Sequence, residues 1–129
     1  MRSTVSKALM SIAALAFMAS PALAADVTKG AKVYKKCVSC HMIGDKAKNR
    51  VGPQLNGIIG REIASLADYK YSKAMVKYAA AEKVWSEENL GAYLANPRKT
   101  VKGTRMAFAG LRKQADVDNV IAYLKENAK

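Results

Sequence analysis

Apolar residues recur at helical spacing in four parts of this chain, and no segment alternates apolar and polar positions as a strand would. The helices that this pattern predicts are 28–37, 72–81, 86–97 and one that begins near Asp116. Asp26 is placed to cap the first of them. The last has a clear apolar stripe, made of Val117, Val120, Ile121 and Leu124. We therefore expect an all-α fold.

Two long segments have no helical or strand pattern. Residues 44–60 are rich in glycine and contain Pro53, and residues 98–111 follow the break at Pro97. Loops of this length in a compact domain are usually functional or wrap around something. We therefore expect the loop 44–60 to be functional or to wrap around a bound group.

The first residues have the pattern of a secretory leader. Arg2 and Lys7 are followed by a short apolar run, 8–18, and then by the small-residue cleavage signal Ala22-Leu23-Ala24. This predicts a cleaved leader at 1–24 and one mature domain at 25–129, exported to the periplasm. An uncleaved membrane anchor is the alternative, but the run is shorter than the roughly 20 residues that cross a bilayer.

The chain is strongly basic, with 22 Lys and Arg residues against ten Asp and Glu. The leader takes two of the basic residues and none of the acidic ones, so the mature chain keeps a net charge of +10. Such a charge suits acidic partners, anionic membrane surfaces or nucleic acid. No nucleic-acid motif is present and export argues against chromosomal DNA, so acidic proteins are the expected partners, with peripheral membrane contact at most.

The segment Cys37-Val38-Ser39-Cys40-His41 has the spacing for covalent attachment of haem. Two thiols on one turn can each add to a haem vinyl group, and the imidazole that follows can bind the iron. A zinc site is disfavoured because the mature chain offers only three Cys and His ligands, where structural zinc takes four. A thioredoxin-like dithiol requires strands, and a disulfide across so small a loop would stabilise little.

His41 is the only histidine, so a second protein ligand to the iron has to be another residue type. The mature chain has three methionines, and Met42 adjoins His41 too closely to reach the opposite face. Met106 lies in an irregular loop, free to turn its sulfur toward a metal. Met75 is on a predicted amphipathic helix, where core packing is the usual role, and stays as the alternative.

The chain resembles the class I c-type cytochromes, the family of mitochondrial cytochrome c and its short bacterial relatives. Besides the haem motif, the segment 51–57, Val-Gly-Pro-Gln-Leu-Asn-Gly, is similar to the family's G-P-x-L-x-G sequence. The resemblance implies that the Pro53 carbonyl accepts a hydrogen bond from the axial imidazole. It also implies that Arg61, Tyr71 and Trp85 lie near the haem propionates.

The segments 90–97 and 103–110 carry the most specific match after the haem motif. They imply that Tyr93 and Thr104 flank Met106 as the second iron ligand and that Phe108 shields the haem edge. Gly30, Tyr34 and Tyr123 match the contact at which the terminal helices cross. Lys102 stands where mitochondrial members have proline, and Met75 falls near a position that is often asparagine.

The resemblance implies a class I cytochrome c fold around one haem c, and a soluble monomeric one-electron carrier that is not an enzyme. A cytochrome bc-type complex is the expected donor, and a terminal oxidase or photosynthetic reaction centre the expected acceptor. A small peroxidase-like haem enzyme and a dedicated subunit of a dehydrogenase or oxidase are the alternatives. Ten basic residues flank the predicted crevice: Lys32, Lys35, Lys36, Lys46, Lys48, Arg98, Lys99, Lys102, Arg105 and Lys113.

Overall fold

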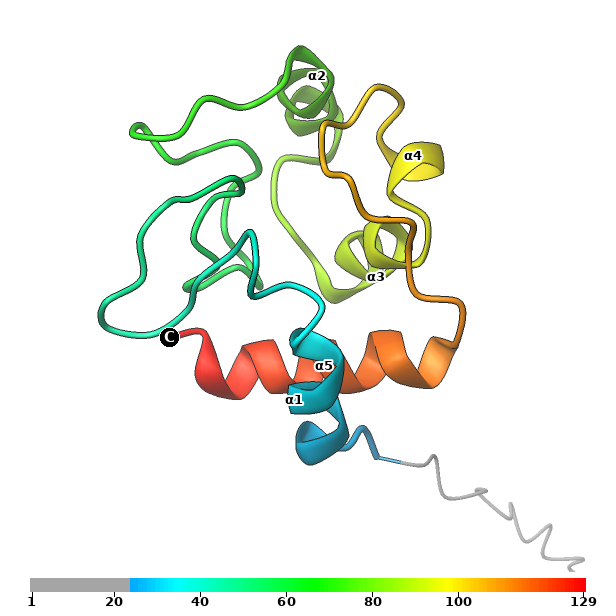
Figure 1. The fold of residues 1–129 in the computed structure, drawn as a ribbon. Helices are drawn as coiled ribbons and strands as arrows, with labels where there is room; N and C mark the ends of the chain where they lie inside the picture. Colours follow the sequence, from blue (N-terminus) through cyan, green and yellow to red (C-terminus); the bar gives the residue numbers. More distant parts are fainter. Residues whose placement is uncertain (1–23) are drawn as a thin grey trace, which may run out of the picture.

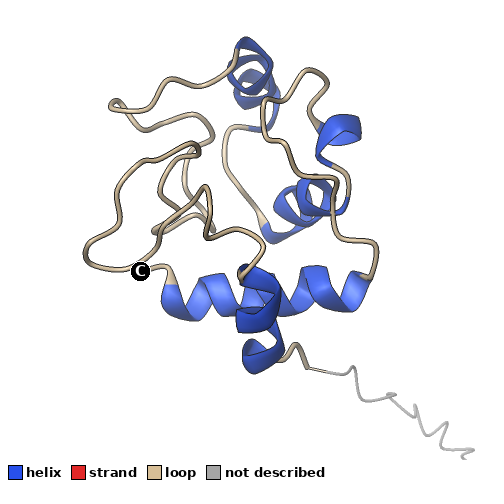
Figure 2. Cartoon of the chain, in the orientation of Figure 1, coloured by secondary structure: helices blue, strands red, loops and turns tan. Residues whose placement is uncertain are grey.

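Five helices, connected by long irregular segments, make up the part of the chain that the computed structural model describes, residues 24–129. They are α1 (Val27–Tyr34), α2 (Lys73–Glu82), α3 (Glu87–Ala95), α4 (Pro97–Thr100) and α5 (Gln114–Asn127). Within these residues there is no strand, only an isolated bridge between Glu62 and Val84. The all-α prediction is confirmed (Figures 1 and 2). The predicted leader lies outside the described residues, apart from Ala24.

Short polar side chains fix where the helices begin. Asp26 accepts the Lys29 N–H at 3.0 Å, and Ser72 accepts the Met75 N–H at 3.0 Å. At α3 the cap is reciprocal: Ser86 accepts the Asn89 backbone N–H and the Asn89 side chain accepts that of Ser86. Each cap satisfies a backbone donor that has no partner inside the helix. These starts agree with the sequence pattern to within a residue.

Two helix predictions need correction. The first helix ends at Tyr34 rather than residue 37, because Cys37 N–H bonds to the Tyr34 carbonyl three residues back and the chain continues as tight turns. The break expected at Pro97 is followed at once by α4. Pro97 takes the first helical position, which proline tolerates because no backbone N–H is needed there. Asn96 caps the turn.

The core forms where α5 meets α1 and α3 (Figure 1). The predicted apolar stripe of α5 is buried, with Val117 and Val120 only 1% and 2% exposed. At the crossing with α1, the backbones approach so closely that a Cβ on Gly30 would lie 2.0 Å from the Asn119 carbonyl oxygen. Only glycine fits there. The rings of Tyr34 and Tyr123 pack beside it with centroids 5.2 Å apart.

The long loops are held by side-chain amides and by scattered backbone bonds. Asn56 bonds both the N–H and the carbonyl of Gly44, at 2.8 and 2.9 Å. Gly57 donates to the carbonyl of Ala128 and Gly60 to that of Trp85. The loop 44–60 is thereby tied to α5 and to the segment before α3. Among residues 24–129, no helix is long and apolar enough to cross a membrane.

Replacing Gly30 by alanine is expected to destabilise the protein by about 3 kcal/mol, because the new methyl group meets backbone that cannot move aside cheaply. Chemical denaturation of the purified holoprotein measures this. Gly91→Ala is the matched control: its Cβ would lie 3.4 Å from the nearest atom, and it gains up to about 1 kcal/mol of helix propensity. Equal effects of the two substitutions would contradict the close crossing.

Replacing Tyr34 by phenylalanine is expected to stabilise the protein by about 1 kcal/mol at pH 7, because its buried hydroxyl has no hydrogen-bond partner in the described chain. Burial, with the nearby Cys37 and Tyr123, raises the pKa of Tyr34 to about 12. The gain from the substitution should therefore grow above about pH 10, where tyrosine ionises in the unfolded chain but not in the folded one.

Denaturation at pH 7 and at about pH 11 tests this expectation. Tyr123→Phe is the control, because the Tyr123 side chain is only partly buried and loss of its hydroxyl should change stability little. A gain from Tyr34→Phe that is the same at both pH values would contradict the argument.

Candidate functional site

The Cys37–His41 motif forms a closed turn directly after α1. The Cys40 and His41 N–H groups both bond to the Cys37 carbonyl, at 3.1 and 2.9 Å. Both thiols are free and partly exposed, and Cys37 packs against the core. Burial raises the pKa of the Cys37 thiol, which disfavours the activated thiolate that a redox dithiol needs. The turn presents two thiols and an imidazole together.

His41 is held in one orientation from one side of its ring. Its Nδ1 lies 2.7 Å from the carbonyl oxygen of Pro53, which can only accept, so the Nδ1–H donates and Nε2 keeps its lone pair. Burial lowers the pKa of the imidazole, which favours the neutral form that binds a metal. The carbonyl bond also raises the basicity of the ring as a ligand.

Gly52 supports the same ring, a role that was not predicted. A Cβ on this residue would lie 2.3 Å from the His41 Cε1 atom, so the ring packs directly on the glycine backbone. Its N–H also bonds to the Cys40 carbonyl at 2.9 Å, which ties the segment 52–53 to the haem motif. The position of Gly52 directly before Pro53 was the available signal.

A second group of predicted residues surrounds Met106. The hydroxyls of Tyr93 and Thr104 lie 2.7 Å apart, and the Met106 N–H bonds to the Thr104 hydroxyl at 3.4 Å. Arg105 donates to the Lys70 carbonyl, which fastens this loop to the segment before α2. Met106 and Phe108 are partly buried against the core. Backbone and side-chain bonds on both sides therefore hold the methionine loop in place.

The remaining predicted residues contribute buried aromatic rings and one guanidinium group. Trp85 is 6% exposed, and its ring lies between those of Tyr78 and Tyr93, with centroids 5.8 and 5.3 Å away. The Tyr71 hydroxyl accepts the Leu66 N–H at 3.3 Å, so its own proton stays available. The ring of Tyr69, which the sequence did not single out, packs edge-on against Tyr71.

The hydrogen bonds of Arg61 leave one of its buried nitrogens free to bind an anion. Its Nη1 donates to the carbonyl oxygens of Gln54 and Asn56, at 2.9 and 3.0 Å. Its Nε is buried and has no partner among the described residues. A buried charged donor left in this way is costly unless an anion meets it. A haem propionate is an anion of the required kind.

The donor set therefore fits haem and does not fit the rival metal site. Cys37 and Cys40 would hold it covalently, the His41 Nε2 nitrogen and the soft Met106 sulfur would bind its iron, and Arg61 would meet a propionate. Within residues 24–129, no three His, Cys, Asp or Glu side chains come together to hold another metal ion. Figure 1 shows the segment that follows α1 (cyan) and the segment that follows α4 (yellow to orange), which come from different parts of the chain.

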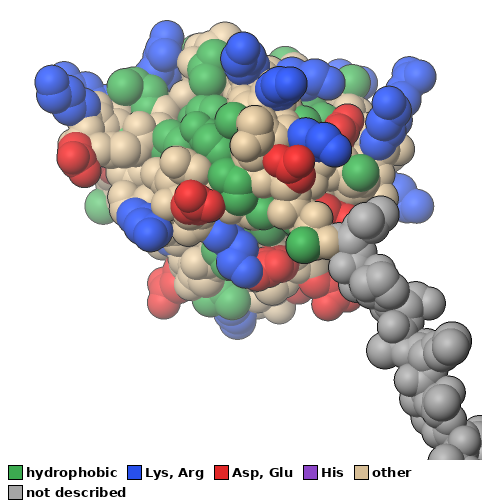
Figure 3. Space-filling model, turned by 90° about the horizontal axis from the view of Figure 1, so that it is seen from below, with side chains coloured by type: hydrophobic (Ala, Val, Ile, Leu, Met, Phe, Trp, Pro, Cys, Tyr) green, Lys and Arg blue, Asp and Glu red, His purple; other side chains and the backbone are tan. Residues whose placement is uncertain are grey.

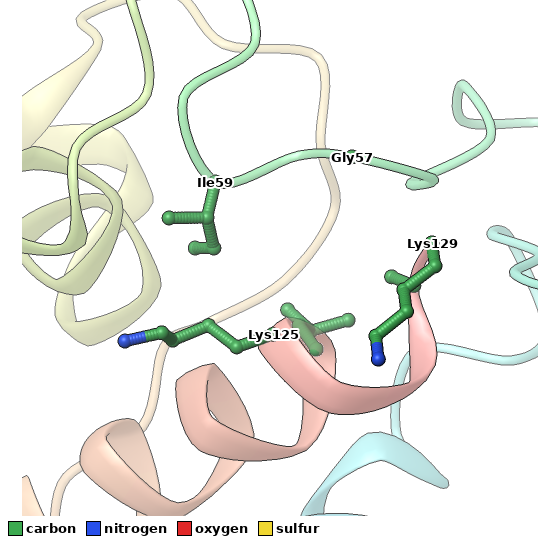
Figure 4. A pocket seen from close by; sticks show the side chains of 6 residues that line it. Gly57, Ile59, Lys125 and Lys129 are labelled. Carbon is green, nitrogen blue, oxygen red and sulfur yellow. The ribbon is translucent and has the colours of Figure 1, made fainter.

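A surface hollow of about 330 Å³ lies elsewhere, between residues 57–59 and the end of α5 (Figure 4). Ile59 points toward α5, and Lys125 and Lys129 lie along its rim. None of the predicted site residues lines it. It is therefore separate from the candidate haem site.

Comparisons with known proteins identify relatives of this chain. The model of the family "Cytochrome c" matches residues 27–128. Cytochrome c2 of Afifella marina is 50% identical over 99 residues, covering 77% of this chain and 80% of that protein. Cytochrome c-550 of Ancylobacter novellus is 48% identical over 97 residues, covering 75% of this chain and 91% of that protein.

The solved structure of cytochrome cH from Methylobacterium extorquens superimposes with a TM-score of 0.70 at 38% identity, and the match covers 78% of this chain and 98% of that one. The helical architecture, the attachment motif and these relatives lead to one conclusion. The chain belongs to the cytochrome c family, has the class I cytochrome c fold, and takes part in electron transport with a covalently attached haem c.

Proposed function

We propose that this protein is a periplasmic one-electron carrier whose haem iron is bound by His41 and Met106. The observation that carries the proposal is the pair of tethers: Pro53 orients the imidazole, and the Tyr93–Thr104 pair supports the methionine loop. The haem supplies a one-electron Fe(III)/Fe(II) couple. With His41 and Met106 both bound to it, the iron would have no open position for a substrate.

The chain's own residues adjust and protect that couple. A Met/His ligand pair favours a high reduction potential. Trp85 and Tyr93 are both buried, and burial raises the pKa of Tyr93, so that its hydroxyl stays neutral. The two rings keep water from the methionine side. Arg61 would meet the propionate charge, and Phe108 would cover the haem edge. These roles describe electron exchange rather than catalysis on a substrate.

The surface around the two ligand segments suits brief docking to an acidic protein. All ten flanking basic side chains predicted from the sequence are exposed. Val38 and Val51 are 45% and 78% exposed, and Arg50 joins their segments by bonding to the Val38 carbonyl at 3.2 Å. An apolar contact with a basic rim gives fast, salt-sensitive association without a large interface.

The physiological setting follows from the leader and the relatives. We propose that residues 1–24 are removed during export and that the mature domain, 25–129, acts as a monomer in the periplasm. Cytochromes c2 and c-550 of bacteria are among its relatives. A cytochrome bc-type complex is the proposed donor, and a terminal oxidase or photosynthetic reaction centre the proposed acceptor.

Carbon monoxide binding distinguishes the carrier from a haem enzyme with an open iron. The reduced native protein should not bind carbon monoxide promptly, because Met106 occupies the position. Met106→Ala should bind it rapidly, and the matched variant Met75→Ala should behave like the native protein. The visible spectrum after gas addition is the measurement. Prompt binding by the native protein, or by Met75→Ala alone, would contradict the ligand assignment.

Electron transfer to an acidic partner should slow steeply as salt rises, because charge mainly sets the association rate and is screened beyond about 8 Å at physiological ionic strength. Stopped-flow oxidation of the reduced protein at limiting partner concentration measures this. Changing Lys99 and Lys102 together to glutamine should lower the rate at low salt, whereas Lys125→Gln on α5 should not. Rates independent of salt would contradict docking through the basic rim.

A further inference from the structure

A second hollow, of about 310 Å³, lies between α3 and α5 where the described chain begins. It is lined by Ala25, Glu87, Asp118, Ile121, Ala122 and Lys125. Figure 3 views the molecule from this side and shows acidic side chains close to the place where the chain enters the folded part. The electron-carrier site uses none of these residues.

The charged groups of this hollow do not balance. Lys125 pairs with Glu87, its only ion-pair partner among the described residues. Asp118 accepts a hydrogen bond from the neutral Gln114 amide at 2.9 Å and pairs with no cation in the described chain. Nearby on α1, Lys29 is taken up by Asp26 at 3.9 Å. One carboxylate in the hollow is therefore left without a counter-charge.

The backbone beside Ala25 is fixed to α5. The Asn119 side chain is only 8% exposed, and its Oδ1 accepts the Asp26 N–H at 2.7 Å. The Asp26 side chain in turn caps α1. Asp26 is therefore held both by its backbone N–H, bonded to α5, and by its side chain, bonded to α1. Since Asp26 follows Ala25 directly, Ala25 cannot move far from the hollow that it lines.

The sequence 22–24 marks the bond between Ala24 and Ala25 as the cleavage site. Hydrolysis of that bond adds one water, leaves a carboxylate on the departing leader and creates an α-ammonium group on Ala25. Before cleavage the same nitrogen is an uncharged amide. Cleavage therefore generates a cation on a residue that already lines the hollow.

We propose that the hollow between α3 and α5 is the binding site for the protein's own processed amino terminus, with Asp118 as the counter-ion of the Ala25 α-ammonium group. The proposal rests on the proposed cleavage. It gives removal of the leader a structural consequence, because the mature domain gains an ion pair between its first residue and α5 that the precursor cannot form.

The pairing should depend on pH in one direction. A carboxylate neighbour raises the pKa of the folded α-amino group above that of an unfolded chain, about 7.7–8.0. The stabilisation is then complete below that range and is lost as pH rises through the folded value. Glu87 and Lys125 also face the hollow, but they pair with each other, and Asp26, which caps α1, pairs with Lys29 on that helix.

The test compares the exported holoprotein with three variants. The first carries two extra residues, Gly-Ser, ahead of Ala25 and so moves the ammonium away. The second is Asp118→Asn, which leaves the Glu87–Lys125 pair intact, and the third combines both changes. Glu126→Gln is the matched control, because it removes a carboxylate from α5 that does not line the hollow. The readouts are an NMR titration of Ala25 and the thermal midpoint at pH 6 and at about pH 9.5.

We expect the pKa of the Ala25 α-amino group to lie several tenths of a pH unit above its range in an unfolded chain. Asp118→Asn should return that pKa to the unfolded range. The extension should lower the midpoint at pH 6 in the native background only. An unshifted titration would overturn the pairing, as would an extension effect that persists in Asp118→Asn.

Failure of the cleavage proposal is read separately, by the intact mass of the exported protein. If that mass places the first residue elsewhere, a chain released to begin at Ala25 by a site-specific protease still gives the titration. Pairing in that chain with a different natural start would mean that the hollow exists but that processing does not use it, which also overturns the proposal.

Discussion

The contact of Gly30 with the carbonyl of Asn119 is the constraint from which the rest of the structure follows. It brings α1 onto α5 at a distance that no other residue allows. Because α1 leads directly into the Cys37–His41 turn, the crossing also fixes where the thiols and the imidazole lie. From there Pro53 and Gly52 orient the ring. The haem motif thus takes its position from a helix contact that contains no haem ligand.

The methionine side is anchored to the same α5 by another route. α3 packs on α5, and the Leu111 N–H bonds to the Leu94 carbonyl, so the loop 101–111 leaves and returns at fixed points. Between these points Tyr93, Thr104 and Arg105 hold Met106 in a segment without helix. The two segments proposed to bind the iron share one helical support, which suits a site that must change charge while moving little. Little free energy is then spent on moving the protein around the haem when the iron gains or loses an electron.

The sequence predicted most of this arrangement for identifiable reasons. Helix periodicity located α2, α3 and α5, although α5 begins at Gln114, two residues before the start expected near Asp116. The buried stripe of α5 followed from its spacing. The sequence pattern did not predict the end of α1 or the presence of α4. Both depend on hydrogen bonds, made by the tight turns and by Asn96, rather than on the spacing of apolar residues. The roles of Gly52 and Tyr69 were missed because they depend on packing in the folded chain, of the His41 ring on the Gly52 backbone and of the Tyr69 ring on Tyr71, which apolar periodicity does not show.

Selective labelling of the methionine methyl groups tests the central claim most directly. In the NMR spectrum of the reduced holoprotein, the ring current of the haem should shift one methionine methyl resonance far upfield, and that resonance should be absent in Met106→Ala. The resonances of Met42 and Met75 should stay near their usual positions. A shifted resonance that belongs to Met75, or the absence of any shifted methionine, would contradict an iron held between His41 and Met106.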